Sequence, residues 1–209
     1  MIGAINPANA VTPKGEKGWR YWGYFQAAPG ANVWSYAETG PAGSTPKDGS
    51  VEGWKYSFSS DTVDTGNPTL KPNFKAICSG TPAQSGLIRV AVVVDFGLRA
   101  IAPTGENVQA TLRQCVSAKP GTNGLEILNK VVPVRTSSSG FVCGLNNFPA
   151  KECSTEITTP KSLLTLIEKS GAISINDELD KAGEKFAAKA GEIWEVPLLI
   201  KSSKLTRIY

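Results

Sequence analysis

Aromatic side chains between positions 19 and 58 form the first group in this chain whose type and spacing point to ligand binding. Aromatic faces stack on sugars and on other flat, partly apolar groups. The stretch GWRYWGYF, Gly18 to Phe25, alone places five rings within eight residues. The whole set comprises Trp19, Tyr21, Trp22, Tyr24, Phe25, Trp34, Tyr36, Trp54, Tyr56 and Phe58. The candidate ligand-binding rings among them are Trp19, Trp22, Tyr24, Trp34 and Trp54.

The rings at the start of this region are expected to point in two directions. Side chains alternate along a β-strand, so Trp19 and Tyr21 should lie on one face, and Trp22 and Tyr24 on the other. One small core cannot bury both pairs unless the strand lies between two layers. We favour core packing for most rings, with one pair either covered by a second part of the molecule or open to a ligand.

Histidine is absent from the 209 residues. Its absence removes the commonest general base, the commonest zinc ligand and the usual partner of a serine or cysteine nucleophile. Carboxylate-only chemistry of the glycosidase type needs two acids at a set separation, and no pair in the sequence stands out for it. We therefore predict a protein that is not an enzyme and that has no catalytic residue, no metal site and no cofactor.

The acidic residues of two short motifs are better explained by backbone structure. A calcium loop needs several oxygen ligands at short alternate spacing, which the segment with Asp48 and Glu52 does not have. Asp48 followed by Gly49 predicts a hairpin turn. Asp95, in the motif DFG, is expected to end a strand and to bond to a backbone amide.

Four cysteines without a C-x-x-C pair predict two disulfide bonds. Cys143 and Cys153 bracket the turn-rich segment GLNNFPAKE, which leaves Cys78 to pair with Cys115. Loop closure assigns roughly 3 and 4 kcal/mol of stabilisation to the shorter and the longer bridge. Such bridges indicate an oxidising compartment, and the alternative is four free thiols in a cytosolic protein.

Strand patterns dominate the chain up to Cys153. The run LIRVAVVVDFG (Leu87–Gly97) is apolar and β-branched, and it predicts a central strand covered on both faces. VEGWKYSFSS alternates aromatic residues with Lys55 and Ser57, as a half-buried strand does. A further strand is expected in GFVCGLN, while PTGENVQATLRQCVSA fits either a short helix or a strand.

Helix patterns are commoner towards the C-terminus. GTNGLEILNKVV predicts a helix with Thr122 as N-cap, and a short helical or extended turn is expected around NFKAIC. TTPKSLLTLIEKSG has Thr159 as cap, Pro160 at the first helical position and Gly171 at the end. NDELDKAGEKFAAKAGEIW carries one apolar stripe and predicts another helix, followed by an extended segment in EVPLLIKSSKLTRIY.

Together these patterns predict an α+β protein with an aromatic-rich antiparallel β-region, a β-grasp-like region with disulfides and a helical C-terminal extension. The expected segments are a flexible arm at 1–17, the aromatic-rich region at 18–86, the β-grasp-like region at 87–153 and the extension at 154–209. The net charge of +4 is scattered, so nucleic acid is not expected as a partner. No signal peptide is apparent, and no apolar run approaches about 18 residues.

The order of several motifs resembles a family of uncharacterised exported actinobacterial proteins, often encoded beside transporters of the energy-coupling-factor type. The motifs are RYWGYF, GPAGSTPKDGSVEGWKYS, FKAIC and RVAVVVDFG. The resemblance covers roughly residues 19 to 153 and includes all four cysteines. It implies an extracytoplasmic location, secreted or at the cell surface, with a signal peptide and often a C-terminal membrane anchor.

A second, weaker similarity covers Arg89 to Pro149. The succession of strand, loop, helix and strand there looks like the β-grasp-related domain of cobalamin carriers. That similarity implies that the turn after the last strand borders a ligand surface, here Asn146, Asn147 and Phe148. The chain departs from cobalamin carriers because it has no histidine and lacks their large helical partner domain.

These observations predict an exported, non-enzymatic binding or accessory protein of the cell envelope, linked to vitamin or metal uptake through a membrane transporter component. The alternative is a glycan-binding or adhesin module that uses exposed tryptophans and takes a cell-envelope glycan as its partner. Burial of Trp19, Trp22, Trp34 and Trp54 would count against that alternative. A third class is a purely structural partner of a membrane complex.

Overall fold

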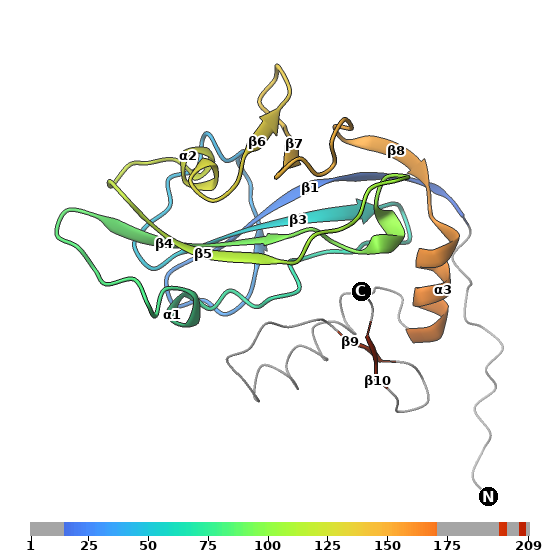
Figure 1. Cartoon of the computed structure of the whole chain (residues 1–209), viewed down its shortest axis with the longest axis horizontal. Helices are drawn as coiled ribbons and strands as arrows, with labels where there is room; N and C mark the ends of the chain where they lie inside the picture. The colour runs from blue at the N-terminus through green and yellow to red at the C-terminus, as the bar shows by residue number, and fades with distance from the viewer. Residues whose placement is uncertain (1–14, 171–196, 200–204, 208–209) are drawn as a thin grey trace, which may run out of the picture.

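A six-stranded mixed β-sheet forms the centre of the molecule (Figure 1). The computed structural model describes residues 15–170, 197–199 and 205–207. The strands of the sheet are β1 (Lys17–Ala27), β2 (Ser35–Tyr36), β3 (Val51–Ser59), β4 (Ile88–Asp95), β5 (Leu112–Ala118) and β8 (Thr155–Thr158). Their order is β2-β1-β3-β4-β5, and β8 pairs with the first part of β1. All pairs are antiparallel except β3 with β4, which run parallel.

Short elements cover both faces of this sheet. They are α1 (Phe74–Ile77), the 3-10 turn η1 (Arg99–Ile101), α2 (Gly124–Asn129), β6 (Val134–Thr136), β7 (Val142–Leu145) and α3 (Lys161–Ser170). The helix α2 and the β6–β7 hairpin lie on one face, α1 lies on the other, and α3 follows β8 at one end (Figure 1). This arrangement confirms the predicted α+β class.

The larger core lies on the face that α2 covers. Phe148 is 1% exposed, and its ring lies 5.0 Å from that of Tyr56, 5.9 Å from that of Phe96 and 6.5 Å from that of Trp22. The other large side chains of this core are Tyr24, Trp54, Phe58, Val90, Val92, Val94, Ile101, Ile127, Leu128, Leu145, Leu163 and Ile167. Every second residue of β3 and β4 contributes, because successive strand side chains point to opposite faces.

A smaller core lies on the opposite face. Val51, Ala91 and Val93 pack there against α1, whose Phe74 ring is partly buried. The disulfide between Cys78 and Cys115 joins the end of α1 to β5 across this face. β4 is therefore buried on both sides, as its apolar sequence predicts.

The polar residues of β3 correct one expectation. Lys55 and Ser57 were expected on a half-exposed face, but they are 1% and 2% exposed. The chain after β3 folds back over them, and the Lys55 ammonium donates to the carbonyl oxygens of Thr65 at 2.6 Å and Asn67 at 2.7 Å. A buried ammonium is tolerated because carbonyl oxygens replace its water.

The boundary predicted between residues 86 and 87 falls between paired strands of one sheet, since β3 and β4 are neighbours. The strand expected near Val142 is present as β7, but it pairs with β6 in a separate two-stranded sheet. Residues 1–14 of the arm predicted at 1–17 lie outside the described residues, whereas Lys17 is already the first residue of β1. The helix expected from Asn176 to Trp194 also lies outside the described residues. Within the last predicted extended segment, β9 (Pro197–Leu199) and β10 (Leu205–Arg207) pair antiparallel.

The N-cap predicted for α2 is displaced by one residue in the structure. Asn123, not the predicted Thr122, is the N-cap of α2, because its side chain accepts from the Glu126 amide at 2.9 Å and forms a capping box. The segment that fitted either a helix or a strand is the strand β5.

The carboxylates of two acidic residues accept hydrogen bonds from backbone amides. Asp95 accepts hydrogen bonds from the amides of Thr69 at 2.8 Å and Gly97 at 2.9 Å, which confirms its predicted role. Asp48 accepts from the Arg89 amide at 2.7 Å. The turn at Asp48 is present, but β2 and β3 both pair with β1, so the predicted hairpin is wrong.

Candidate functional site

Four of the candidate binding residues are core residues. Trp22, Tyr24, Trp54 and Phe148 are 7%, 6%, 1% and 1% exposed. The Trp22 indole donates to the Phe148 carbonyl at 3.0 Å, and the Trp54 ring stacks on Tyr24 at 4.4 Å. Side chains packed in this way offer no face to an external ligand.

Trp34 is half-buried and covers the smaller core. Its indole donates to the Leu70 carbonyl at 2.8 Å. A Cβ atom at Gly53 would lie 2.6 Å from the Trp34 ring, so a side chain at position 53 would collide with the ring where it now lies. The Trp34 ring therefore belongs mainly to the fold.

Trp19 is the candidate ring that the structure leaves open, and it has aromatic neighbours. It is 49% exposed, and Tyr21 lies two residues further along the same face of β1. Tyr36, 60% exposed, pairs with Phe25 from β2, and their rings meet edge to face at 5.2 Å. We call Trp19, Tyr21 and Tyr36 the aromatic strip.

Tyr21 and Tyr36 were not among the residues selected from the sequence. The alternation of β1 already placed Tyr21 beside Trp19, whereas nothing local in the sequence indicates that Tyr36 pairs with Phe25. Burial raises the pKa of the Tyr36 hydroxyl, and the charges of Tyr21 and Asp64 raise it further. The Tyr21 hydroxyl also accepts from the Ser59 hydroxyl at 3.3 Å.

Acidic residues lie beside the Trp19 end of the aromatic strip. Lys17, on β1, forms an exposed ion pair with Glu156 of β8 at 2.7 Å. Glu16 accepts hydrogen bonds from the Thr62 amide at 2.8 Å and the Ser60 hydroxyl at 2.5 Å, and these bonds lower its pKa. Glu156 also lies directly opposite Trp19 in the sheet, so acidic residues come from both sides of the start of β1.

Asn146 and Asn147, the other candidates, form the tip of a tight turn. Both are exposed and have positive φ angles of 49° and 61°. Leu145 and Phe148 exchange backbone hydrogen bonds of 2.9 Å across them, which defines a two-residue hairpin turn, and asparagine tolerates its left-handed backbone. The Asn146 side chain donates to the Gln109 side-chain oxygen at 2.7 Å.

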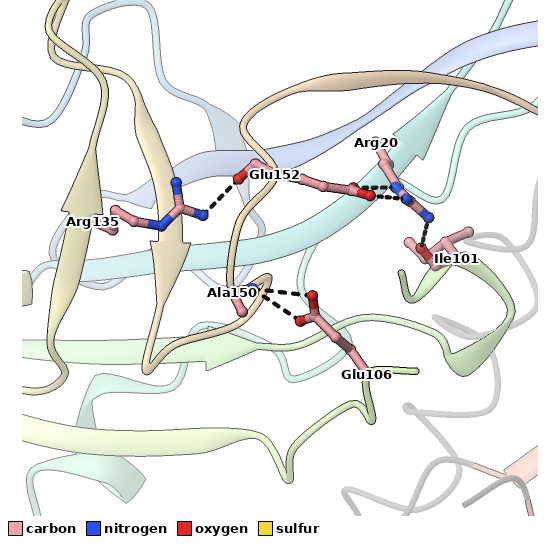
Figure 2. A network of polar contacts seen from close by, with 6 residues as sticks. All are labelled: Arg20, Ile101, Glu106, Arg135, Ala150 and Glu152. Carbon is pink, nitrogen blue, oxygen red and sulfur yellow. Dashed lines mark hydrogen bonds and ion pairs between the residues drawn. The ribbon is translucent and has the colours of Figure 1, made fainter. Parts of the chain in front are cut away.

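An ion pair fixes the chain that follows this turn (Figure 2). The Arg20 guanidinium, on β1, makes two parallel bonds to the Glu152 carboxylate, one of them 2.7 Å long. Arg20 also donates to the Ile101 carbonyl at 3.3 Å. The amide of Ala150 donates to the Glu106 carboxylate at 3.0 Å.

Arg135 of β6 adds a second fixed point to the same segment. One nitrogen of its guanidinium donates to the carbonyl oxygens of Glu152 at 2.6 Å, Pro149 at 2.8 Å and Cys143 at 3.2 Å. The disulfide between Cys143 and Cys153 closes the segment, which confirms the second predicted bridge. Every charged group drawn in Figure 2 bonds to the chain itself, so the network has a structural role.

A carboxyl group is buried beneath the start of α2. Glu52 is 2% exposed and accepts hydrogen bonds from the Tyr24 hydroxyl and, at 3.3 Å, from the Gln26 amide. Tyr24 also bonds to the Ser44 hydroxyl at 2.8 Å. A Cβ at Gly124 would lie 2.7 Å from the Tyr24 hydroxyl and 3.3 Å from the Glu52 carboxyl, so the site has no spare space.

Burial raises the pKa of the Glu52 carboxyl, although the hydrogen bonds from Tyr24 and Gln26 partly oppose this. Burial also raises the pKa of the Tyr24 hydroxyl, and the charge of Glu52 raises it further. Burial is thus the main cause of both shifts, and it favours the neutral form of each group.

No group of three or more His, Cys, Asp or Glu side chains in residues 15–170 is arranged to hold a metal ion. In the same part of the chain, no helix has the length and apolar character required to cross a membrane.

The sheet, the two disulfides and the polar network define a disulfide-bonded α+β domain with a largely aromatic core. The model of the SCO2322-like domain family matches residues 14–158, and the chain belongs to this family. The match ends at the last residue of β8 and so coincides with the central sheet. No curated protein and no solved structure matches the chain.

Family membership confirms part of the resemblance seen in the sequence, namely that the chain belongs to a family of uncharacterised proteins. The actinobacterial origin, the transporter neighbourhood and the similarity to cobalamin carriers stay predictions.

Proposed function

We propose that this domain is an extracytoplasmic, non-enzymatic binding or accessory protein of the cell envelope. The observation that carries the proposal is the pair of disulfides, with all four cysteines of the chain bonded. Structural disulfides persist in oxidising compartments and are rare where glutathione keeps thiols reduced.

The two bridges close chain segments of very different length. The sequence separations are 37 residues for Cys78–Cys115 and 10 residues for Cys143–Cys153. Loop-closure entropy assigns them about 4 and about 3 kcal/mol, against a total stability of about 5–15 kcal/mol for a typical domain. A fold that depends on its bridges to this extent needs an oxidising environment.

A non-catalytic role is supported by what the polar groups do. The chain has no histidine. Among the described acids, Glu52 and Asp95 are buried and bonded to the fold, and Glu106 and Glu152 fix the segment in Figure 2. Groups committed in this way are poorly placed to exchange protons with a substrate.

The proposed partner is a component of a membrane transporter for a vitamin or a metal, with the domain acting through protein contact. This partner rests on the resemblance to exported proteins encoded beside such transporters. A domain of this kind needs no cofactor of its own.

The second candidate function is glycan binding at the cell envelope. The exposed Trp19 favours it, whereas the burial of Trp22, Tyr24 and Trp54 removes three of the five candidate rings. Binding would then depend on a smaller set of rings than the sequence suggested.

Production in two compartments, followed by counting of free thiols, tests whether the protein needs an oxidising environment. The protein is produced once in the bacterial periplasm and once in a reducing cytoplasm, and free thiols are alkylated under denaturing conditions and counted by mass spectrometry. We expect no alkylated cysteine and cooperative unfolding only in the periplasmic product. An equally stable cytoplasmic product with four free thiols would overturn the proposal.

Calorimetric titration with cobalamins and corrinoid precursors tests direct vitamin binding. Heat that saturates would assign the vitamin to this domain. If no heat of binding is measured at high micromolar vitamin concentration, the domain does not bind the vitamin directly. The proposed contact with the transporter is then tested by cross-linking to the co-produced transporter component.

A further inference from the structure

We infer that the aromatic strip, Trp19, Tyr21 and Tyr36, binds a neutral polysaccharide chain along the outer part of β1. This inference deepens the glycan-binding candidate and rests on it. It does not depend on the transporter proposal, because it concerns a different partner and a different measurement.

The strip has the dimensions of an extended ligand rather than of a single small molecule. Trp19 and Tyr21 are two residues apart on one strand face, a spacing of about 7 Å. Tyr36 is the cross-strand partner of Phe25. Phe25 lies six residues from Trp19, a distance of about 20 Å along β1. The rings therefore form a row on which successive sugar rings can stack.

The Tyr36 end of the row is held in place by the core beneath it. Phe25 is 4% exposed and supports the Tyr36 ring at 5.2 Å with an interplanar angle of 85°. Gly23 leaves room for this ring, since a Cβ there would lie 2.9 Å from Phe25. Rings with few free rotations lose little conformational freedom on binding, which favours affinity.

Polar groups for sugar hydroxyls lie beside the rings. The Tyr21 hydroxyl accepts from the Ser59 hydroxyl at 3.3 Å, and Ser59 pairs with Trp19 in the sheet and forms a bridge with Asp64. Aromatic faces flanked by a few hydroxyl and carboxylate groups are the usual lining of a site for a polar ring compound. Phe141 is also exposed, at 70%, but it stands in the β6–β7 turn, outside this row.

Charge selects among polysaccharides. Glu156 lies opposite Trp19 in the sheet and pairs with the ammonium of Lys17, and Glu16 lies just before β1 with its carboxylate bonded to the Thr62 amide. A phosphate- or uronate-bearing polymer would meet like charge there, whereas a neutral chain would not. The acidic surroundings thus favour a neutral glycan.

A peptide added as a strand is the competing occupant. β8 pairs with β1 as far as Arg20, and β2 pairs from Phe25 onward, so only residues 21–24 of this edge have no partner strand among the described residues. Four residues are fewer than the five or six of a typical strand. The exposed rings, rather than the strand edge, are therefore the main feature of this surface.

Affinity electrophoresis tests the inference. Native gels are run towards the cathode, because the chain has a net charge of +4, and contain hydroxyethyl cellulose, galactomannan, soluble β-glucan or, as the anionic comparison, polygalacturonate. We expect retardation by at least one neutral polymer and none by polygalacturonate. Trp19→Ala and Tyr36→Ala should each weaken retardation roughly tenfold.

Phe141→Ala is the matched control, since it removes an exposed ring of another surface and should leave retardation unchanged. Trp19→Phe should restore part of the binding that Trp19→Ala loses, and circular dichroism checks that each variant is folded. The inference is overturned if no neutral polymer retards the protein, if the strip variants run like Phe141→Ala, or if only polygalacturonate binds. None of these results would change the number of free thiols, so the proposed extracytoplasmic location is tested separately.

Discussion

Replacing Glu52 by glutamine should change how stability depends on pH. The folded-state pKa of Glu52 is raised above its ordinary value of 4.5, mainly by burial. The protonated carboxyl is therefore favoured in the fold, and its contribution is fully present below about pH 4.5. It is lost as pH rises through the raised folded-state pKa. Glutamine is neutral at every pH and still offers an oxygen to the Tyr24 hydroxyl.

The size of the effect follows from proton linkage. One proton bound by the folded but not the unfolded chain changes the free energy of unfolding by about 1.4 kcal/mol per pH unit within that window. Each kcal/mol corresponds to about 2–4 °C in Tm for a domain of this size. The wild-type protein should lose stability relative to Glu52→Gln from about pH 4.5 upward and level off above the folded-state pKa.

Urea denaturation followed by tryptophan fluorescence measures this difference, at pH values from about 4 to about 8 and with both disulfides oxidised. Glu38→Gln, which removes an exposed carboxylate, is the matched control and should give a nearly constant difference from wild type. A difference between wild type and Glu52→Gln that is the same at every pH would refute the reasoning. The buried carboxyl would then bind protons equally in both states.

Three further changes test the framework of the fold. Cys153→Ser should lower the free energy of unfolding by about 3 kcal/mol, measured by urea denaturation; an unchanged value would show that the bridge only fixes local geometry. Gly97→Ala should cost more than Gly105→Ala, about 3 against about 1 kcal/mol, because both glycines have positive φ but only at position 97 would a Cβ overlap a backbone oxygen. Equal losses would contradict that difference. A double-mutant cycle with Arg20→Met and Glu152→Gln should give a coupling of about 1–2 kcal/mol, since the ion pair is partly buried. A coupling near zero would mean that Arg135, Glu106 and the Cys143–Cys153 disulfide hold the segment without the ion pair.

Local patterns in the sequence predict those features of the fold that neighbouring residues determine. The run from Leu87 to Gly97 predicts a doubly covered strand, and the turn-rich segment between Cys143 and Cys153 predicts their bridge. The alternation of Trp19 and Trp22 predicts that the rings of β1 divide between two faces. Each of these depends on residues close together in the chain, where periodicity and chain reach are informative.

Features that depend on distant segments were not predictable in the same way. The parallel pairing of β3 with β4 requires the chain between them to cross one face of the sheet, and no local signal specifies this. The same crossing buries Lys55, which by residue type belonged on a solvent face. Tyr36 enters the aromatic strip only because β2 pairs with β1 at Phe25.

The pairing of β1 with β8 has a mechanical consequence. Lys17 lies opposite Thr158, and the Thr159 amide donates to the Glu16 carbonyl at 2.8 Å, so the chain enters and leaves the sheet at the same place. Tension applied through residues 16 and 159 would break the hydrogen bonds between β1 and β8 one after another rather than all at once. The first yielding should occur at low force and release only β8, while Cys143–Cys153 limits how far the chain can extend beyond it.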